Sequence, residues 1–137
     1  MMTRILVVDR ETDFPKALAR AVASESCAIE VASTESAALA ATRAEPALVF
    51  IRIAGEVRAA ARLVGRLRAR HPTVPIACVA ADPGGRGEVT LRRKGILCYL
   101  QEPVDERILR QVVRGAHLPY GKEVKSEKGQ TTVSSEK

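Results

Sequence analysis

Apolar residues fall in five short runs, separated by longer stretches in which apolar and polar residues recur at helical spacing. Runs this short and rich in Val, Ile and Leu are typical of β-strands. Between Pro46 and Gly55, the five residues from Ala47 to Ile51 are all apolar, which predicts a strand buried on both faces in the middle of a parallel sheet. The run from 27 to 32 alternates, which predicts an edge strand. The predicted strands cover residues 4–8, 27–32, 47–52, 75–81 and 96–100.

The stretches between these runs predict helices. In the longest of them, Val57, Ala61, Val64 and Leu67 fall on one helical face. Start and stop residues frame the others: Thr12 or Asp13, Thr34 and Asp105 are suitable N-caps, while Pro46, Pro72 and Gly95 end helices. The predicted helices cover about residues 13–24, 35–44, 56–70, 88–94 and 106–116.

Strand and helix therefore alternate five times. This order predicts one α/β domain with a five-stranded, mostly parallel sheet, right-handed crossovers and helices on both faces. We expect this domain to span residues 1–117. Residues 118–137 are rich in Gly, Ser, Thr, Lys and Glu, which predicts a disordered polar tail, either a linker or a simple terminus.

In sheets of this kind the functional site lies just beyond the carboxyl ends of the strands. The central predicted strand ends in Arg52, and the first strand is followed by Asp9. The sequence thus places a guanidinium at the position where folds of this kind usually have their functional site.

Composition narrows the class of protein. The chain is 46% apolar but only 3% aromatic, so its core must be aliphatic. No apolar run reaches about 18 residues, so we expect no membrane span, and without a recognisable signal peptide we expect a cytoplasmic protein. The net charge, 22 − 16 = +6, fits an acidic partner, a nucleic acid or merely solvated helix faces, and composition does not separate these.

Candidate metal and catalytic residues are few. Cys27, Cys78 and Cys98 lack metal-ligand spacing and are interpreted as core thiols. His71 and His117 lack partners for catalysis. The glycine-rich stretch 82–87 lacks the Lys-Ser/Thr of a phosphate-binding loop and is interpreted as a mobile loop. We therefore expect no cofactor, no metal and no enzymatic activity.

Four segments, RILVVD, EPALVFIRI, HPTVPIACVAA and KGILCYLQEP, resemble the receiver domain of two-component response regulators over residues 4–116. The last segment is the most specific, and the resemblance implies a cis peptide before its proline. It also implies a flavodoxin-like (βα)5 fold with a parallel sheet of strand order 2-1-3-4-5.

The resemblance also implies a phosphorylation site, which this chain has largely lost. A working receiver needs two acids after the first strand to hold Mg²⁺, a carboxylate nucleophile, a hydroxyl and a lysine. The matching positions here are Asp9, Arg10, Arg52, Ala80 and Glu102. Arginine has no lone pair with which to attack phosphorus. We therefore expect a pseudo-receiver that cannot be phosphorylated and that signals by protein–protein interaction.

At two of these positions, the residue in this chain has the opposite charge to the residue that the resemblance implies. Because the two strand ends are close in that fold, we expect Arg52 to pair with Glu102, and with Asp9 as a further contact. The alternative is that both side chains point independently into solvent.

Two arginine-rich surfaces are candidate interaction sites. The resemblance places the first, over the last two helices and the last strand, where receivers dimerise or bind partners; its residues are Arg92, Arg93, Tyr99, Arg107, Arg110 and Arg114. The second is a stripe at every fourth position of the third helix, formed by Arg58, Arg62, Arg66 and Arg70. That stripe supports the alternative function, a basic accessory protein that binds nucleic acid.

Overall fold

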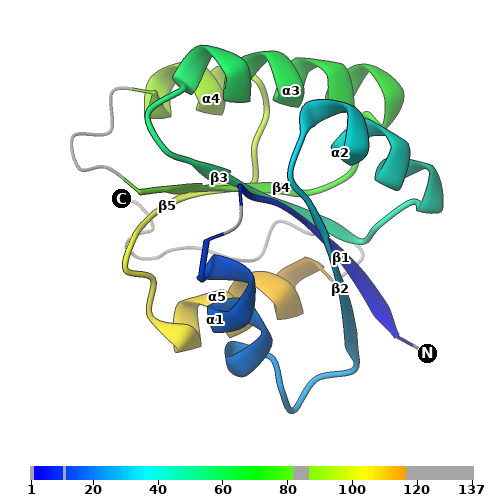
Figure 1. Ribbon diagram of the computed structural model, residues 1–137, viewed down its shortest axis with the longest axis vertical. Coiled ribbons are helices and arrows are strands. Elements are labelled where there is room, and N and C mark those ends of the chain that lie inside the picture. Colours follow the sequence, from blue (N-terminus) through cyan, green and yellow to red (C-terminus); the bar gives the residue numbers. More distant parts are fainter. Residues whose placement is uncertain (1, 11, 82–86, 117–137) are drawn as a thin grey trace.

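The computed structural model describes residues 2–10, 12–81 and 87–116 (Figure 1). The predicted tail, His117, Glu11 and most of the glycine-rich stretch lie outside these residues. The strands are β1 (Thr3–Val8), β2 (Cys27–Ala32), β3 (Leu48–Ile53), β4 (Ile76–Ala80) and β5 (Cys98–Gln101). The helices are α1 (Phe14–Ala21), α2 (Glu35–Ala41), the 3₁₀ turn η1 (Thr42–Ala44), α3 (Val57–Arg70), α4 (Glu88–Arg93) and α5 (Glu106–Ala116).

The five strands form one parallel sheet in the order β2-β1-β3-β4-β5. The predicted flavodoxin-like topology is therefore confirmed. β3 lies at the centre, and β2 and β5 are the two edges. All five carboxyl ends meet at one side of the sheet, as a parallel arrangement requires.

Helices cover both faces of the sheet: α1 and α5 lie on one side, and α2, α3 and α4 on the other (Figure 1). Each face buries its own cluster of side chains. Phe50 joins Leu18, Leu109 and Val112 under α1 and α5, while Ile51 joins Leu67 and Leu91 on the opposite face. Both clusters are almost wholly aliphatic, as the composition predicts.

Several predicted boundaries differ from the structure. β3 continues to Ile53, so Arg52 is its penultimate residue. The first helix ends at Ala21, not Ser24, because the chain turns through Val22. β5 begins two residues later than predicted, at Cys98. The second helix tightens into η1, where the Thr42 hydroxyl donates to the Leu39 carbonyl.

No helix in the described ranges is long and apolar enough to cross a membrane.

Candidate functional site

The sheet brings four of the five predicted site positions to its carboxyl edge. Asp9 follows β1 directly, and Ala80 is the last residue of β4. Arg52 lies in β3 opposite Val79, one residue before the Ile53–Ala80 pair. Glu102 follows β5, and its peptide bond to Pro103 is cis, as the resemblance implied. Arg10, the fifth position, is exposed in the loop after β1.

Arg52 and Glu102 form a bidentate ion pair. The Arg52 Nε donates to Glu102 Oε2 at 3.0 Å, and Nη2 donates to Oε1 at 2.9 Å. The two side chains are only 16% and 24% exposed. Parallel hydrogen bonds of this type are stronger and more directional than single ones. The predicted charge-reversed pair is therefore present, and solvent screens it less than a surface pair.

Asp9 is the buried anion beneath this pair, with a side chain only 1% exposed. Its Oδ2 accepts two hydrogen bonds from Thr12, from the backbone N at 3.1 Å and from the hydroxyl at 2.6 Å. Its Oδ1 lies 3.8 Å from Arg52 Nη1, within ion-pair range but too far for a hydrogen bond. Asp9 thus anchors the loop into α1 and acts as a second counter-ion for Arg52.

Thr12, one of the two predicted N-caps, caps the start of α1 through its hydroxyl. Asp13 occupies the N-cap position of α1 but makes no capping hydrogen bond with its side chain. The Thr12 hydroxyl accepts from the Phe14 backbone N at 3.2 Å while donating to Asp9. The start of α1 is therefore tied to the buried carboxylate.

The geometry does not fit Mg²⁺, the ion that the fold family implies. Mg²⁺ requires several oxygen ligands in octahedral geometry. Within the described ranges no cluster of three or more Asp, Glu, His or Cys side chains is placed to hold a metal ion. The guanidinium of Arg52 faces the one buried carboxylate instead.

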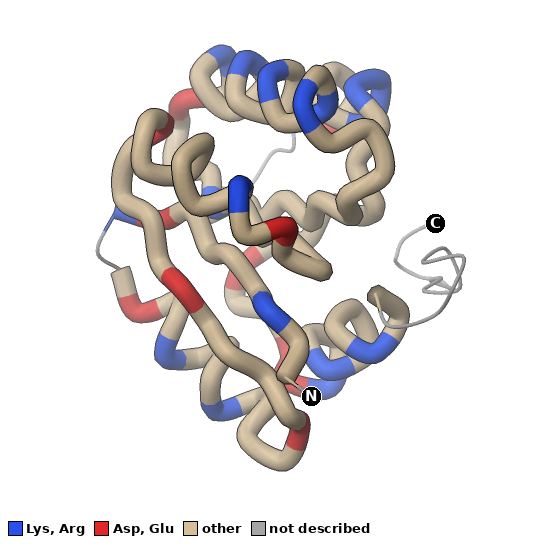
Figure 2. Tube along the Cα trace, turned by 90° about the vertical axis from the view of Figure 1, so that its right-hand side faces the viewer, with Lys and Arg blue, Asp and Glu red and all other residues tan. Residues whose placement is uncertain are grey.

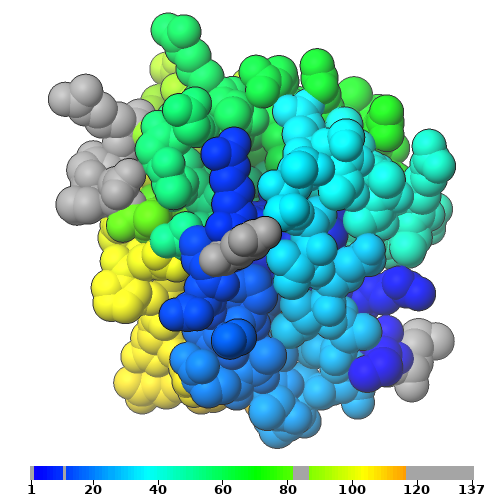
Figure 3. All heavy atoms as spheres, in the orientation of Figure 1, coloured from blue at the N-terminus to red at the C-terminus, as the bar shows by residue number. Residues whose placement is uncertain are grey.

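A cleft of about 230 Å³ opens beside the pair, between α2, α3 and the ends of β1 and β3. In Figure 3 the blue, cyan and green segments that form it meet at the front surface. Its charged lining residues balance, three arginines against three acids: Arg10, Arg52 and Arg62, with Asp9, Glu35 and Glu56. This balance favours neither a metal ion nor an anion.

The structure divides the predicted interaction residues into two groups. Arg110 donates to the Ala21 carbonyl at 3.1 Å, and Arg114 donates to Glu25 at 2.9 Å. The hydrogen bond to Glu25 raises the pKa of Arg114. These two side chains thus fasten α5 to α1 and to the loop before β2. Arg107 is exposed and pairs with Asp105.

The other group lies around α4. Arg92 pairs with Glu88 one turn earlier, at 2.8 Å. Tyr99 is half-buried on the same face of the sheet, where burial and the Glu88 carboxylate raise the pKa of its phenol. Arg93 is exposed, and Val89 is a 60% exposed aliphatic side chain that the sequence reasoning missed.

The α3 arginine stripe is interrupted by an acid. Both Arg62 and Arg66 donate to Glu35 at the start of α2. Arg58 and Arg70 are exposed at opposite ends of the helix. The stripe is thus less suited to follow a phosphate backbone than its spacing predicted.

Arg68, off the stripe, has a structural role that sequence reasoning also missed. Its guanidinium donates to the Gly95 carbonyl at 2.7 Å and to the His71 carbonyl at 3.3 Å. Partial burial lowers its pKa. The side chain joins the end of α3 to the turn before β5; no local sequence motif marks such a contact.

Solved structures similar to this chain are response regulators and their receiver domains. The receiver domain of NtrX from Brucella abortus is 25% identical over 88% of this chain and 99% of its own, with a TM-score of 0.71. A response regulator from Thermotoga maritima is 20% identical over 85% of this chain and 98% of its own, with a TM-score of 0.76. Together they support the assignment of a receiver-type domain.

A longer NtrX chain from Brucella abortus, solved in complex with ADP, is 26% identical over 85% of this chain, with a TM-score of 0.74. The match covers 26% of that NtrX chain, so this protein spans about a quarter of its length. No protein-family model matches the chain, and no curated protein sequence is significantly similar to it.

Proposed function

We propose that this protein is a phosphorylation-incompetent receiver-type module of two-component (phosphorelay) signalling, which acts in the cytoplasm by binding other proteins. The observation that carries the proposal is the bidentate Arg52–Glu102 pair. By resemblance, its two members stand where a receiver has its nucleophile and its lysine. Each has the opposite charge to the residue that phosphotransfer requires.

The chemistry of the site supports this proposal. A guanidinium stays protonated at any accessible pH and cannot attack phosphorus. Two unit charges about 4 Å apart interact by about 4 kcal/mol near a protein surface. A divalent cation beside Arg52 would therefore be repelled by the guanidinium, and the Glu102 carboxylate that could offset this repulsion already accepts two hydrogen bonds from Arg52. Ala80 has no hydroxyl with which to contact a phosphoryl group.

The α4–β5 surface is the part of the predicted interaction region that remains available for a partner. Arg92, Arg93, Tyr99 and the exposed Val89 combine positive charge with apolar area. Interfaces are enriched in arginine and aromatic residues. We assign partner binding to this surface, with Arg107 at its margin, and not to Arg110 or Arg114, whose side chains hold α5 in place.

Acetyl phosphate with Mg²⁺ tests the loss of phosphorylation. The intact mass of the wild-type protein should not increase by a phosphoryl group, and millimolar Mg²⁺ should leave its melting temperature unchanged, because only a ligand of the folded state raises it. A phosphorylatable receiver domain serves as the positive control. Stoichiometric phosphorylation of the wild type, or a Mg²⁺-dependent rise in melting temperature, would contradict the proposal.

Partner capture from the native cytosol tests the binding surface. Arg92→Glu with Arg93→Glu should abolish capture, whereas the matched pair Arg58→Glu and Arg70→Glu on α3 should not. Loss of binding only in the α3 variant, with a steep dependence on salt, would favour nucleic acid instead.

A further inference from the structure

The outer edge of β2 offers backbone groups for pairing, except for the Cys27 N–H, which donates to the Glu25 carbonyl at 3.1 Å. Hydrogen bonds from Thr3 N to the Ser26 carbonyl and from Asp9 N to the Ala32 carbonyl mark the two ends of its ladder with β1. In a parallel pair, alternate residues direct both backbone groups to the same neighbour. The even-numbered residues of β2 therefore face β1, and Cys27, Ile29 and Val31 direct theirs outward. Figure 2 views this edge, and no described helix crosses in front of it.

The usual devices that protect an edge strand are sparse here. Proline, lysine and bulges discourage pairing at sheet edges, yet β2 has the sequence CAIEVA. Val31 is 48% exposed, one of the few large apolar side chains on the surface of the described residues. Glu30 is the single charge on the strand.

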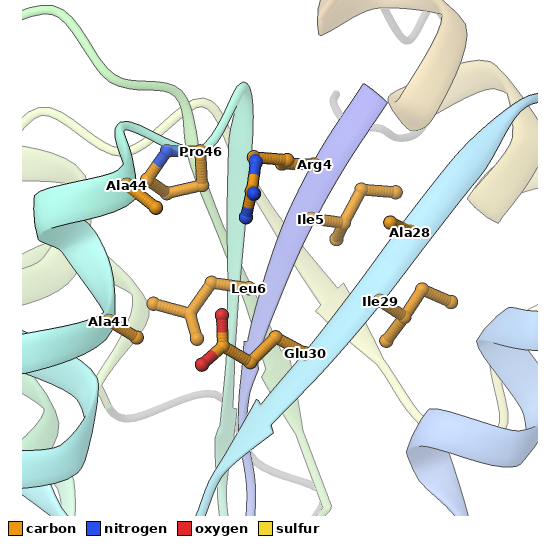
Figure 4. A pocket seen from close by; sticks show the side chains of 9 residues that line it. All are labelled: Arg4, Ile5, Leu6, Ala28, Ile29, Glu30, Ala41, Ala44 and Pro46. Atoms are coloured by element: carbon orange, nitrogen blue, oxygen red, sulfur yellow. The ribbon is translucent and has the colours of Figure 1, made fainter. Parts of the chain in front are cut away.

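Arg4 and Glu30 are two exposed, opposite charges on neighbouring strands, and neither side chain makes a hydrogen bond or ion pair within the described residues. Both line a hollow of about 70 Å³ on the α2 side of the sheet (Figure 4). Arg4 is the register partner of Ala28, and Glu30 pairs with Leu6. The small methyl group of Ala28 is thus all that separates Arg4 from the open edge.

We propose that a second copy of this chain pairs with β2 in antiparallel orientation, about a two-fold axis at Ile29, so that the two sheets become one. The outward N–H and C=O of Ile29 then bond to those of Ile29 in the second copy. Val31 N–H meets the outward carbonyl of Cys27 in the second copy, and Val31 is covered. Ala28 lies opposite Glu30 of the second copy, on the α2 side.

This register supplies both charges with a partner. Strands lie about 4.8 Å apart, and directly opposed residues that are not hydrogen-bonded to each other have Cα atoms about 4.5 Å apart. Arg4 and Glu30 of the second copy would thus be separated by about 9–10 Å at their Cα atoms, which their two long side chains can span across Ala28. The two-fold axis produces this ion pair twice.

The competing register is disfavoured by the same glutamate. A shift that centres the axis on Glu30 would place the two Glu30 carboxylates directly opposite each other, and like charges in that position destabilise a strand pair. The Ile29-centred register avoids this contact. The dimer would leave β5 and α4, at the opposite edge of the sheet, free for a partner, and it does not depend on the proposed function.

Backbone pairing can be tested with proline at an outward-facing position. Proline is tolerated on an edge strand where its N–H would point outward. We expect sedimentation velocity of the full chain to show a dimer, and Val31→Pro to weaken it by at least about tenfold. Val31→Thr, which keeps the N–H, should remain dimeric; circular dichroism checks that both variants fold. A wild-type protein that stays monomeric at about 100 μM, well above the Kd of a specific dimer, would overturn the proposal.

A charge swap tests the register. Arg4→Glu and Glu30→Arg should each weaken the dimer by about tenfold, since each leaves like charges facing across the interface. Combining them restores opposite charges, so the double variant should regain most of the wild-type affinity. A dimer indifferent to these changes, or one broken instead by Arg92→Glu with Arg93→Glu, would place the interface elsewhere and refute the β2 assignment.

Discussion

β3 passes through two different environments within six residues. From Leu48 to Ile51 every side chain is at most 2% exposed and surrounded by aliphatic groups from both helical layers. Arg52 comes next, and it pairs with two carboxylates, from the loops after β1 and β5. Non-directional apolar packing holds the interior part of β3 in place, whereas hydrogen bonds and ion pairs with defined directions hold its carboxyl end.

Under the proposed function, this difference explains how a receiver-type fold can persist without phosphotransfer chemistry. Burial of apolar surface supplies most of the stability of a domain, and it depends on volume and pattern along the strand. The strand end contributes little to that burial. Its charges can therefore be reversed, provided that each buried charge still has a partner.

The interior should be the more sensitive of the two regions. Phe50 is fully buried, and its ring meets that of Phe14 edge to face, with centroids 5.6 Å apart. We expect Phe50→Ala to lower the free energy of unfolding by about 3–5 kcal/mol, from lost burial and the cavity left behind. Urea unfolding measures this value. A loss below about 1 kcal/mol would mean that β3 is not the centre of the core.

The interior thiols should give the second-largest effect, at alkaline pH. Burial raises the pKa of Cys78 above its usual value and that of Cys98 to about 12. At pH values well below about 8.5, the usual pKa of a thiol, both thiols are neutral whether the chain is folded or unfolded, so their contribution is fully present. Above that pH the unfolded chain ionises first, and stability should fall by about 1.4 kcal/mol per pH unit for each thiol.

Cys78→Val isolates that contribution. Between about pH 9 and 10.5, the unfolding free energy of this variant should fall less steeply with pH than that of the wild type. The difference in slope should equal the contribution of one thiol. An unchanged slope would show that Cys78 ionises equally easily in the folded state.

The smallest effect should come from exposed charges. Glu35 accepts from Arg62 and Arg66, whose side chains are 56% and 57% exposed. Exposed ion pairs contribute about 0–1 kcal/mol and weaken in salt. Glu35→Ala should therefore change the unfolding free energy by no more than about 1 kcal/mol. A larger, salt-independent loss would show that Glu35 is as critical as the carboxylates around Arg52.

The sequence predicted the fold well because its apolar pattern directly reflects burial. The central strand was recognised from five adjacent apolar residues, and its neighbours from the alternation of runs and helical stretches. The Arg52–Glu102 pair was predicted because a parallel sheet brings strand ends together, whatever their distance along the chain. The choice of Arg52 and Glu102 as the two positions came from the resemblance to receiver domains alone.

The remaining contacts depend on side-chain directions that no local pattern encodes. The rotation of α5 points Arg110 and Arg114 toward α1, which separates them from Arg92 and Tyr99. Thr12 caps α1 as predicted, but no local pattern indicates the hydrogen bond that its hydroxyl also donates to the Asp9 carboxylate. Arg68 has the spacing of an ordinary helix residue, yet its guanidinium reaches carbonyls of two later turns.

A double-mutant cycle on Arg52→Ala and Glu102→Ala, measured by urea unfolding, tests the central claim most directly. Because the pair is bidentate and largely shielded from solvent, we expect a coupling energy of about 1.5–3 kcal/mol. The same cycle on Arg62 and Glu35 is the exposed control and should give about 0.5 kcal/mol. A coupling energy for Arg52 and Glu102 no larger than that of the control would mean that the two side chains do not form a stabilising pair at the strand end, and would contradict the account.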